Sequence, residues 1–192
     1  MNAVEAGKVE KLTALEAGTT AEAAMTFFDS LQPVELGTMI GSWRGSGLPT
    51  GHPLDGLLER VNWHGKRFDS PEDVHPLIFS GGGTQLYSVN PARVPMGLIA
   101  SHPGLFNSRL AACLFPMLRG LLRTRKPAAR LRMTEYRGVT SATMLYDALP
   151  INDIFRKIDD DTLLCLMDMR GAQAPFFFVL RRETGVDRAA RD

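Results

Sequence analysis

Acidic residues are missing from a long internal stretch of this chain. None occurs between Asp73 and Glu135, an interval that holds arginines and a lysine, although the formal net charge of the whole chain is only +1. The middle of the protein is therefore basic and its flanks are acidic. Such a charge distribution favours an anionic partner, such as a phospholipid head group or a fatty-acid carboxylate. Nucleic acid is not expected, because Phe106 and Phe115 fit the apolar face of a helix and leave no exposed aromatic residues among the basic ones.

Cysteines and long apolar runs are also scarce. The two cysteines, Cys113 and Cys165, each lie in an apolar run, which favours buried free thiols over a disulfide. No apolar run approaches the ~20 residues of a membrane span. Glu5 and Glu10 stand near the N-terminus, where a secretory signal would have an apolar segment. We expect a cytoplasmic protein.

Motifs of established chemistry are missing as well. No Gly-x-Ser-x-Gly or Cys-x-x-Cys sequence occurs. The glycines at 81–83 are followed by neither Lys-Ser/Thr nor a helical pattern, so they indicate a turn or bulge and not a phosphate-binding loop. The histidines lie in loop-like contexts without the spacing of a metal site, and no metal is predicted. These histidines are His52, His64, His75 and His102.

Helical patterns occupy the N-terminus and the middle of the chain. Residues 3–17 favour one helix, and Thr19 or Thr20 caps a second that ends before Pro33. We expect both to cover one mouth or one side of a sheet structure. Residues 104–126 repeat apolar side chains at helical spacing among basic ones. That segment fits either a helix packed across the sheet or a basic amphipathic lid that gates a cavity or touches anionic lipid.

The second half of the chain has the pattern of an antiparallel meander. Five short runs rich in strand-forming residues are separated by brief turns, which predicts a sandwich or an up-and-down barrel. The runs are 130–137, 140–146, 152–158, 162–170 and 175–183. Residues 36–43 are a further strand candidate, and residues 62–68 fit two short extended pieces joined by a tight turn with Gly65 at the bend.

Alternation along these strands is compatible with a cavity. In 162–170 one face begins with Leu163, Cys165 and Met167, whereas the other begins apolar and ends at Asp168 and Arg170. Apolar faces with polar groups near one end suit a ligand pocket, or strands packed between a core and covering helices. The nine methionines favour the pocket, since their side chains adapt to a ligand.

Gly41-Ser42-Trp43-Arg44-Gly45 resembles the signature of the bacterial GXWXG-motif domain. Runs in the C-terminal part, such as Glu135–Gly138, resemble the uncharacterised domain that usually follows it, and together the two resemblances span about residues 35–182. The Gly-x-Trp pattern is also similar to the first strand of lipocalin and fatty-acid-binding barrels. That likeness implies that Trp43 closes one end of the barrel and packs against a basic residue of a late strand, Arg181 or Arg182. Of the two, we expect Arg181 to be this partner.

A likeness to nitrobindin-like haem barrels is weaker. Those barrels need an axial histidine on a late strand, and this chain has none after His102. No haem or other cofactor is therefore expected.

These observations predict an α+β protein that is mainly β, with one lipocalin-like antiparallel barrel. Its expected segments are N-terminal helices (1–34), the GXWXG-motif segment (35–100), a helical insertion (101–129), a strand meander that completes the same barrel (130–183) and a tail (184–192). The sequence does not indicate the oligomeric state.

The leading functional hypothesis is binding of a small hydrophobic or lipid-like ligand with an anionic group inside the barrel. Arginines would pair with that group, tyrosines would hydrogen-bond it and methionines would line the cavity. The candidate binding residues are Arg44, Glu135, Tyr136, Arg137, Met144, Tyr146, Arg156, Met167, Asp168 and Arg170. One alternative is a small-molecule enzyme that uses a buried carboxylate, Glu135 or Asp168, and catalysis is the less favoured interpretation. Another is a filled structural or partner-binding barrel.

Overall fold

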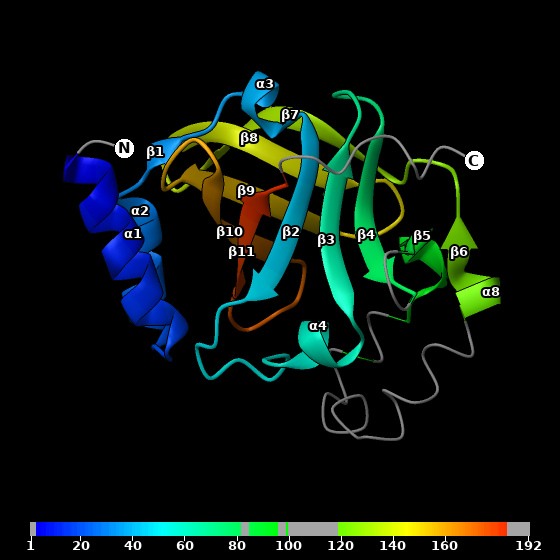
Figure 1. The fold of residues 1–192 in the computed structure, drawn as a ribbon, viewed down its shortest axis with the longest axis horizontal. Helices are drawn as coiled ribbons and strands as arrows, with labels where there is room; N and C mark the ends of the chain where they lie inside the picture. The colour runs from blue at the N-terminus through cyan, green and yellow to red at the C-terminus, as the bar shows by residue number, and fades with distance from the viewer. Residues whose placement is uncertain (1–2, 82–84, 96–98, 100–118, 184–192) are drawn as a thin grey trace.

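A computed structural model describes residues 3–81, 85–95, 99 and 119–183 of the chain. Its centre is a closed barrel of eight antiparallel strands (Figure 1). The strands follow each other around the ring as β3, β2, β11, β10, β9, β8, β7 and β4, and pairing of β3 with β4 closes it. Their bounds are Gly41–Gly47 (β2), Trp63–Phe68 (β3), Val74–Ser80 (β4), Ala129–Tyr136 (β7), Val139–Tyr146 (β8), Ile151–Lys157 (β9), Thr162–Met169 (β10) and Phe176–Arg182 (β11).

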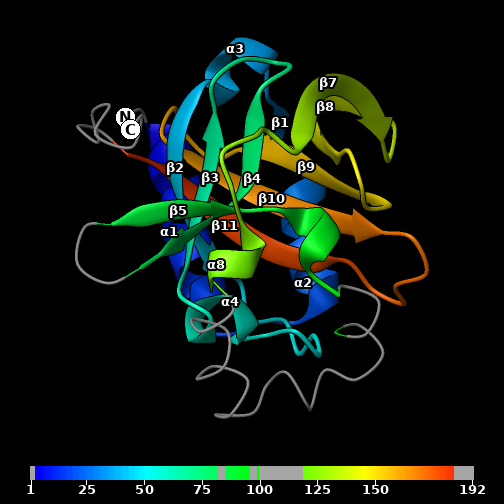
Figure 2. The same cartoon turned by 90° about the vertical axis from the view of Figure 1, so that its right-hand side faces the viewer.

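Short elements lie outside this ring. Strand β1 (Gln32–Pro33) pairs with β9, and β5 (Leu86–Val89) extends from β4 and pairs in turn with β6 (Arg123–Thr124). Strands β5 and β6, together with helix α8 (Arg119–Leu122), occupy the side turned to the viewer in Figure 2. A 3₁₀ turn, η1 (Pro91–Arg93), follows β5.

The five strands predicted after residue 130 are confirmed as β7 to β11, each within a residue or two of its expected bounds. Two other expectations were wrong. Residues 36–39 form helix α3 (Leu36–Met39) before β2 begins at Gly41. The two extended pieces expected within residues 62–68 are one continuous strand, β3, with no turn at Gly65. Most of the predicted 104–126 helix lies outside the described residues, so its suggested contact with anionic membranes stays a prediction. None of the described helices has the length and apolar character to cross a membrane.

The N-terminal helices cover one side of the barrel. Helices α1 (Ala3–Glu16) and α2 (Ala21–Asp29) lie along the outside of β9 to β11 (Figure 1), and the Thr20 side chain caps α2 by accepting from the Ala23 N–H. Phe28 of α2 contacts Phe177 of β11 edge to face, with ring centroids 6.2 Å apart. This outer apolar layer is separate from the core inside the barrel. Strands β9 to β11 therefore bury both faces.

Trp43 closes one end of the barrel beneath α3. Its side chain is fully buried, and its indole N–H donates to the Met39 carbonyl at 2.7 Å. The guanidinium of Arg182 lies 4.2 Å from the indole ring centroid and donates to the Thr38 carbonyl at 2.7 Å. The expected partner, Arg181, points outward and pairs with Glu16 at 2.8 Å, because successive strand residues face opposite sides of a sheet.

Arg182→Ala should lower the free energy of unfolding by about 2 kcal/mol, because it removes a cation–π contact and charge-assisted bonds to backbone carbonyls. The matched change Arg181→Ala removes only a surface ion pair and should cost less than about 1 kcal/mol. Urea unfolding of both variants measures the difference. Equal losses would show that Arg182 does not hold this end of the barrel.

Candidate functional site

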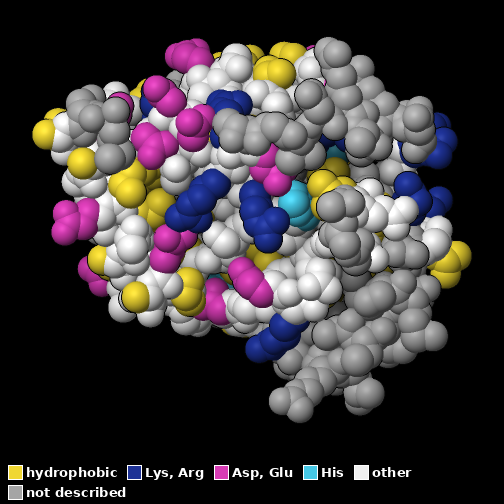
Figure 3. Space-filling view, viewed as in Figure 1, with side chains coloured by type: hydrophobic (Ala, Val, Ile, Leu, Met, Phe, Trp, Pro, Cys, Tyr) yellow, Lys and Arg dark blue, Asp and Glu magenta, His cyan; other side chains and the backbone are white. Residues whose placement is uncertain are grey.

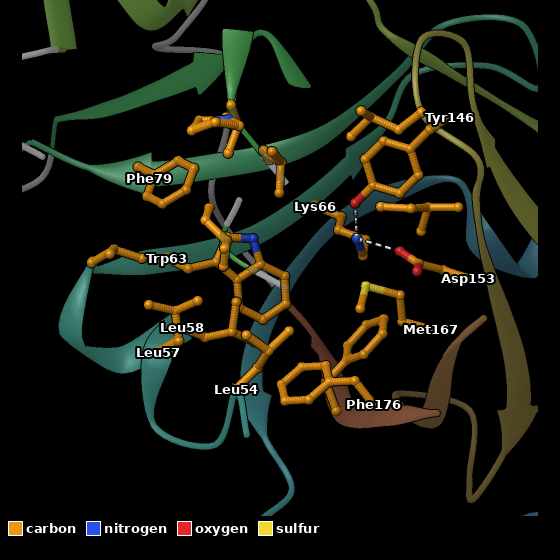
Figure 4. Close-up of a pocket in the computed structure, with 18 of the residues that line it drawn as sticks. Leu54, Leu57, Leu58, Trp63, Lys66, Phe79, Tyr146, Asp153, Met167 and Phe176 are labelled. Carbon is orange, nitrogen blue, oxygen red and sulfur yellow. Dashed lines mark hydrogen bonds and ion pairs between the residues drawn. The ribbon is translucent and has the colours of Figure 1, made fainter. Parts of the chain in front are cut away.

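An apolar cavity of about 340 Å³ occupies the barrel toward the end that lies near helix α4 (Leu57–Arg60), away from Trp43 and α3. Leucines of α4 and the preceding turn form one wall, and aromatic rings from β3, β4 and β11 form another (Figure 4). Residues after β5, with Leu122 of α8, line the outer part. Strands from both halves of the chain thus line this partly open cavity.

Three polar side chains meet at the inner wall of this cavity. Lys66 of β3 lies 2.7 Å from Asp153 Oδ2, and both side chains are almost fully buried. The Lys66 ammonium also donates to the Pro76 carbonyl at 3.2 Å and to the Tyr146 hydroxyl at 3.4 Å. These contacts use all three of its N–H donors. Asp153 Oδ1 is buried with no hydrogen-bond partner among the described residues.

Both Trp63 and Lys66 face the cavity although strict alternation would place them on opposite sides of β3. The pairing of β3 with β4 shifts register on either side of Gly65, whose φ is 153°. Such a bulge inserts an extra residue and re-aims the side chains that follow it. The irregular strand therefore supplies the ammonium and an aromatic wall together.

Two glycines, which have no Cβ atom, allow β2 and β3 to approach each other at this point. A Cβ at Gly65 would lie 1.9 Å from the Trp43 carbonyl oxygen, and one at Gly45 would lie 2.0 Å from the Trp63 ring. Gly45 therefore gives the Trp63 ring its place against β2. The Trp63 indole N–H is buried and has no partner within the described part of the chain.

Burial dominates the electrostatics of the polar cluster. It raises the pKa of Asp153 above its ordinary value, and the neighbouring Lys66 ammonium and Tyr146 hydroxyl reduce that rise. Burial also raises the pKa of Tyr146 well above its ordinary value, with the Asp153 charge adding to the effect. Tyr146 therefore stays a protonated hydrogen-bond donor across the physiological range.

Comparison with known families divides the chain as its sequence does. The family model described as GXWXG protein matches residues 26–83, and the domain of unknown function DUF4334 matches residues 127–182. Both domains are present in this chain. A crystal structure of a protein from Thermomonospora curvata superposes with a TM-score of 0.66 at 29% identity, over 94% of this chain and 99% of that one. No curated protein matches significantly.

The GXWXG domain contributes β2 to β4 and α4, and the DUF4334 domain contributes β7 to β11. Lys66 thus comes from the first domain, whereas Asp153 and Tyr146 come from the second. Neither domain holds the complete polar cluster, and the cavity forms only where the two close one barrel.

Of the ten binding residues expected from the sequence, Tyr146 and Met167 line the cavity. Met144 is buried inside the barrel but lies outside the cavity lining. Four others are exposed away from it: Arg44, Glu135, Asp168 and Arg170. The carboxylates proposed for an enzyme, Glu135 and Asp168, are therefore not buried. The buried carboxylate at the cavity is Asp153.

Arg44 belongs to a charged cluster on the outer face of β2 and β3. Its guanidinium lies 3.4 Å from His64 Nδ1, and His64 Nε2 lies 2.8 Å from Glu183 Oε1. Figure 3 shows this face, where basic and acidic side chains alternate around a histidine. Arg44 therefore takes part in surface pairing.

The remaining three expected residues surround α2. Arg137 forms a bidentate pair with Asp29 at the end of α2, and Tyr136 packs against the outer apolar layer. Arg156 is 1% exposed, with its guanidinium 4.9 Å from the Phe28 ring centroid and 3.3 Å from the Tyr136 carbonyl. All three thus contact the helical cover and not the barrel interior.

The other lining residues that carry a polar group were not among those expected to bind: Trp63, Lys66, Arg93 and Asp153. A signal existed for Asp153, because it shares its strand face with Ile151 and Phe155, both buried in the barrel core or its lining. Lys66 had no such signal, because the bulge at Gly65 breaks the alternation. Arg93 belongs to the 3₁₀ turn η1, outside the barrel strands, so strand periodicity does not predict the direction of its side chain.

Lys66→Met should lower the free energy of unfolding at pH 7 by about 3–5 kcal/mol, because it leaves the Asp153 carboxylate buried without its cation. A folded-state pKa above the unfolded value of about 3.9 means that the Asp153 carboxyl favours folding most below that value and loses this contribution as pH rises through the folded pKa. Because Lys66 lowers the pKa of Asp153, removing Lys66 raises that pKa further. The stability deficit of Lys66→Met should therefore be smaller at pH 5, where more of the carboxyl is protonated, than at pH 7.

The control is the double change Lys66→Met with Asp153→Leu, which leaves no buried charge at this position. Chemical denaturation at both pH values should show that it recovers most of the lost stability. A deficit of Lys66→Met that is equal at pH 5 and pH 7 would contradict the assignment of the loss to Asp153.

Proposed function

We propose that the protein binds a small, largely apolar molecule in the barrel cavity. The observation that carries the proposal is a partly open space of about 340 Å³, within the range of small-molecule sites and lined by apolar side chains around one polar cluster. A filled barrel would leave no such space. The cavity favours ligand binding over a purely structural role.

The charges on the lining suggest how such a ligand is oriented. Asp153 already balances the Lys66 ammonium at the inner wall, so that wall offers no net positive charge. Arg93 is exposed at the outer part of the cavity, and its guanidinium donates to the Leu121 carbonyl. No ion pair with a carboxylate is found for it among the residues that the structure describes, so its positive charge is not balanced there. An anionic group on the ligand would therefore sit beside Arg93, with the apolar portion inside the barrel.

Met167→Trp tests whether the cavity is the binding site. The larger ring fills the space from its lining, so binding of 11-(dansylamino)undecanoic acid should weaken at least ~10-fold. Met133→Trp is the matched control, because Met133 is 37% exposed and lies outside the lining. Dansyl fluorescence titration measures both, and native mass spectrometry before and after organic extraction detects any ligand that co-purifies. Equal binding by both variants, or no binding by the unaltered protein, would refute the proposal.

Arg93→Gln tests the orientation of the ligand. The change should weaken binding of the dansyl acid by roughly 5- to 10-fold and leave binding of its methyl ester unchanged, since only the acid meets the guanidinium. In 0.5 M salt, the same titration should show a smaller difference in affinity between the acid and the ester, because salt screens the charge of the guanidinium. Equal effects of Arg93→Gln on acid and ester would indicate that the anionic group does not lie at Arg93.

A further inference from the structure

Asp153, which lines the apolar cavity, has one carboxylate oxygen without a hydrogen-bond partner in the described structure. One carboxylate oxygen is fixed by Lys66 at 2.7 Å, whereas Oδ1 is buried with no partner in the described structure. Buried polar atoms almost always have a partner, so an unpaired one at a cavity indicates a group that is met by a ligand. Among the described residues, Asp153 is the one carboxylate with a buried side chain.

Tyr146 supplies a donor beside that acceptor. Tyr146 lies on β8, and Asp153 lies on the neighbouring strand β9. Met144, two residues before Tyr146 on β8, is the residue that pairs with Asp153. Figure 4 shows the Tyr146 hydroxyl directed toward Lys66, next to the Asp153 carboxylate. The Tyr146 oxygen accepts a hydrogen bond from Lys66, and its own proton lies beside the Asp153 carboxylate, whose pKa it lowers. Rotation about the C–O bond turns this proton from the carboxylate to the oxygen of a bound ligand.

An acceptor oxygen and a hydroxyl donor on one apolar wall fit a particular chemistry. Removal of a proton from a carbon beside a carbonyl needs a base near that carbon and a hydrogen-bond donor at the carbonyl oxygen, where negative charge develops. Here the two groups are fixed by adjacent strands, and Lys66 holds the carboxylate through its other oxygen. Lys66 is thus a positioning residue.

We infer that this cavity catalyses proton transfer on an apolar ketone, with Asp153 as base and Tyr146 as donor to the carbonyl oxygen. Asp153 Oδ1 takes a proton from the carbon beside the carbonyl, and the C–H electron pair forms the C=C bond of an enolate. Tyr146 hydrogen-bonds the enolate oxygen. Asp153 then returns the proton to the same carbon or, in a β,γ-unsaturated ketone, to the γ-carbon, which moves the double bond into conjugation.

The inference rests on the proposed function, since the ketone must occupy the same cavity. Burial supports it in a second way. A carboxylate whose pKa lies above its ordinary range is a stronger base once ionised, and it has less hydration to lose when the ketone binds. The step needs no oxidant, reductant or second substrate, because Asp153 gives back one proton for each that it removes. In deuterium oxide the proton held by the carboxyl group exchanges with solvent before its return, so the ketone becomes labelled.

Hydrogen–deuterium exchange of 2-decanone in deuterium oxide tests the first half of the reaction. NMR should show that the unaltered protein accelerates loss of the proton signals beside the carbonyl, and Asp153→Asn should reduce the enzymatic rate at least ~100-fold. Tyr146→Phe should reduce it by roughly 10- to 100-fold. Asp168→Asn is the matched control, since that carboxylate is exposed on the neighbouring strand, and its rate should not change.

Conversion of dec-4-en-2-one into its conjugated isomer, followed by ultraviolet absorbance, tests the return of the proton to the γ-carbon. The rate of isomerisation should fall in Asp153→Asn and stay unchanged in Asp168→Asn, as for the exchange reaction. If Asp153→Asn fails to fold because Lys66 is left unpaired, the double change Lys66→Met with Asp153→Asn removes both charges. That protein should bind the dansyl probe and show no exchange.

The two proposals fail in different ways. Probe binding that Met167→Trp abolishes, with exchange of 2-decanone no faster than in buffer, would overturn proton transfer and leave ligand binding intact. Equal exchange rates for the unaltered protein and a folded Asp153→Asn would also overturn it. Absence of probe binding together with absence of exchange would overturn both.

Discussion

The close approach of β2 to β3 is the contact on which the rest of the barrel depends. At Gly65 any side chain would overlap the Trp43 carbonyl, and at Gly45 it would overlap the Trp63 ring. Because these two positions carry only hydrogen, the strands pair tightly while one tryptophan turns toward each end of the barrel. Trp43 closes the end beneath α3, and Trp63 forms a wall of the cavity. The GXWXG motif is thus a packing device that shapes both ends.

The irregular strand pairing at Gly65 also explains how a lysine side chain comes to lie inside an apolar barrel. The register shifts around Gly65 bring Lys66 to the inside, where Asp153 from the DUF4334 domain meets it at 2.7 Å. A buried ammonium without a partner carries a large desolvation cost, so the two domains must supply the charges together. The ion pair links the halves of the chain at the cavity wall.

Strand periodicity was the part of the sequence that predicted the fold well. Short, evenly spaced strands with brief turns depend on local residue choice, and β7 to β11 were predicted within a residue or two. The candidate site was harder to predict, because it depends on which face of each strand looks inward. The outer face of β9 to β11 is as apolar as the inner one beneath α1 and α2, so alternation alone could not separate Arg156 from Asp153. The bulge at Gly65 broke alternation altogether.

Stability alone does not account for the composition of the cavity. Replacing a buried ion pair with well-packed apolar side chains is often neutral or stabilising, and filling an empty space of this size would add further contacts. A barrel that served only as a scaffold would therefore be at least as stable without Lys66, Asp153 and the space beside them. The pair leaves one carboxylate oxygen without a partner in the described structure, and the residue that carries it lines the cavity. An open cavity and a partly satisfied charge in the same place are better explained by recognition of a ligand than by the needs of folding.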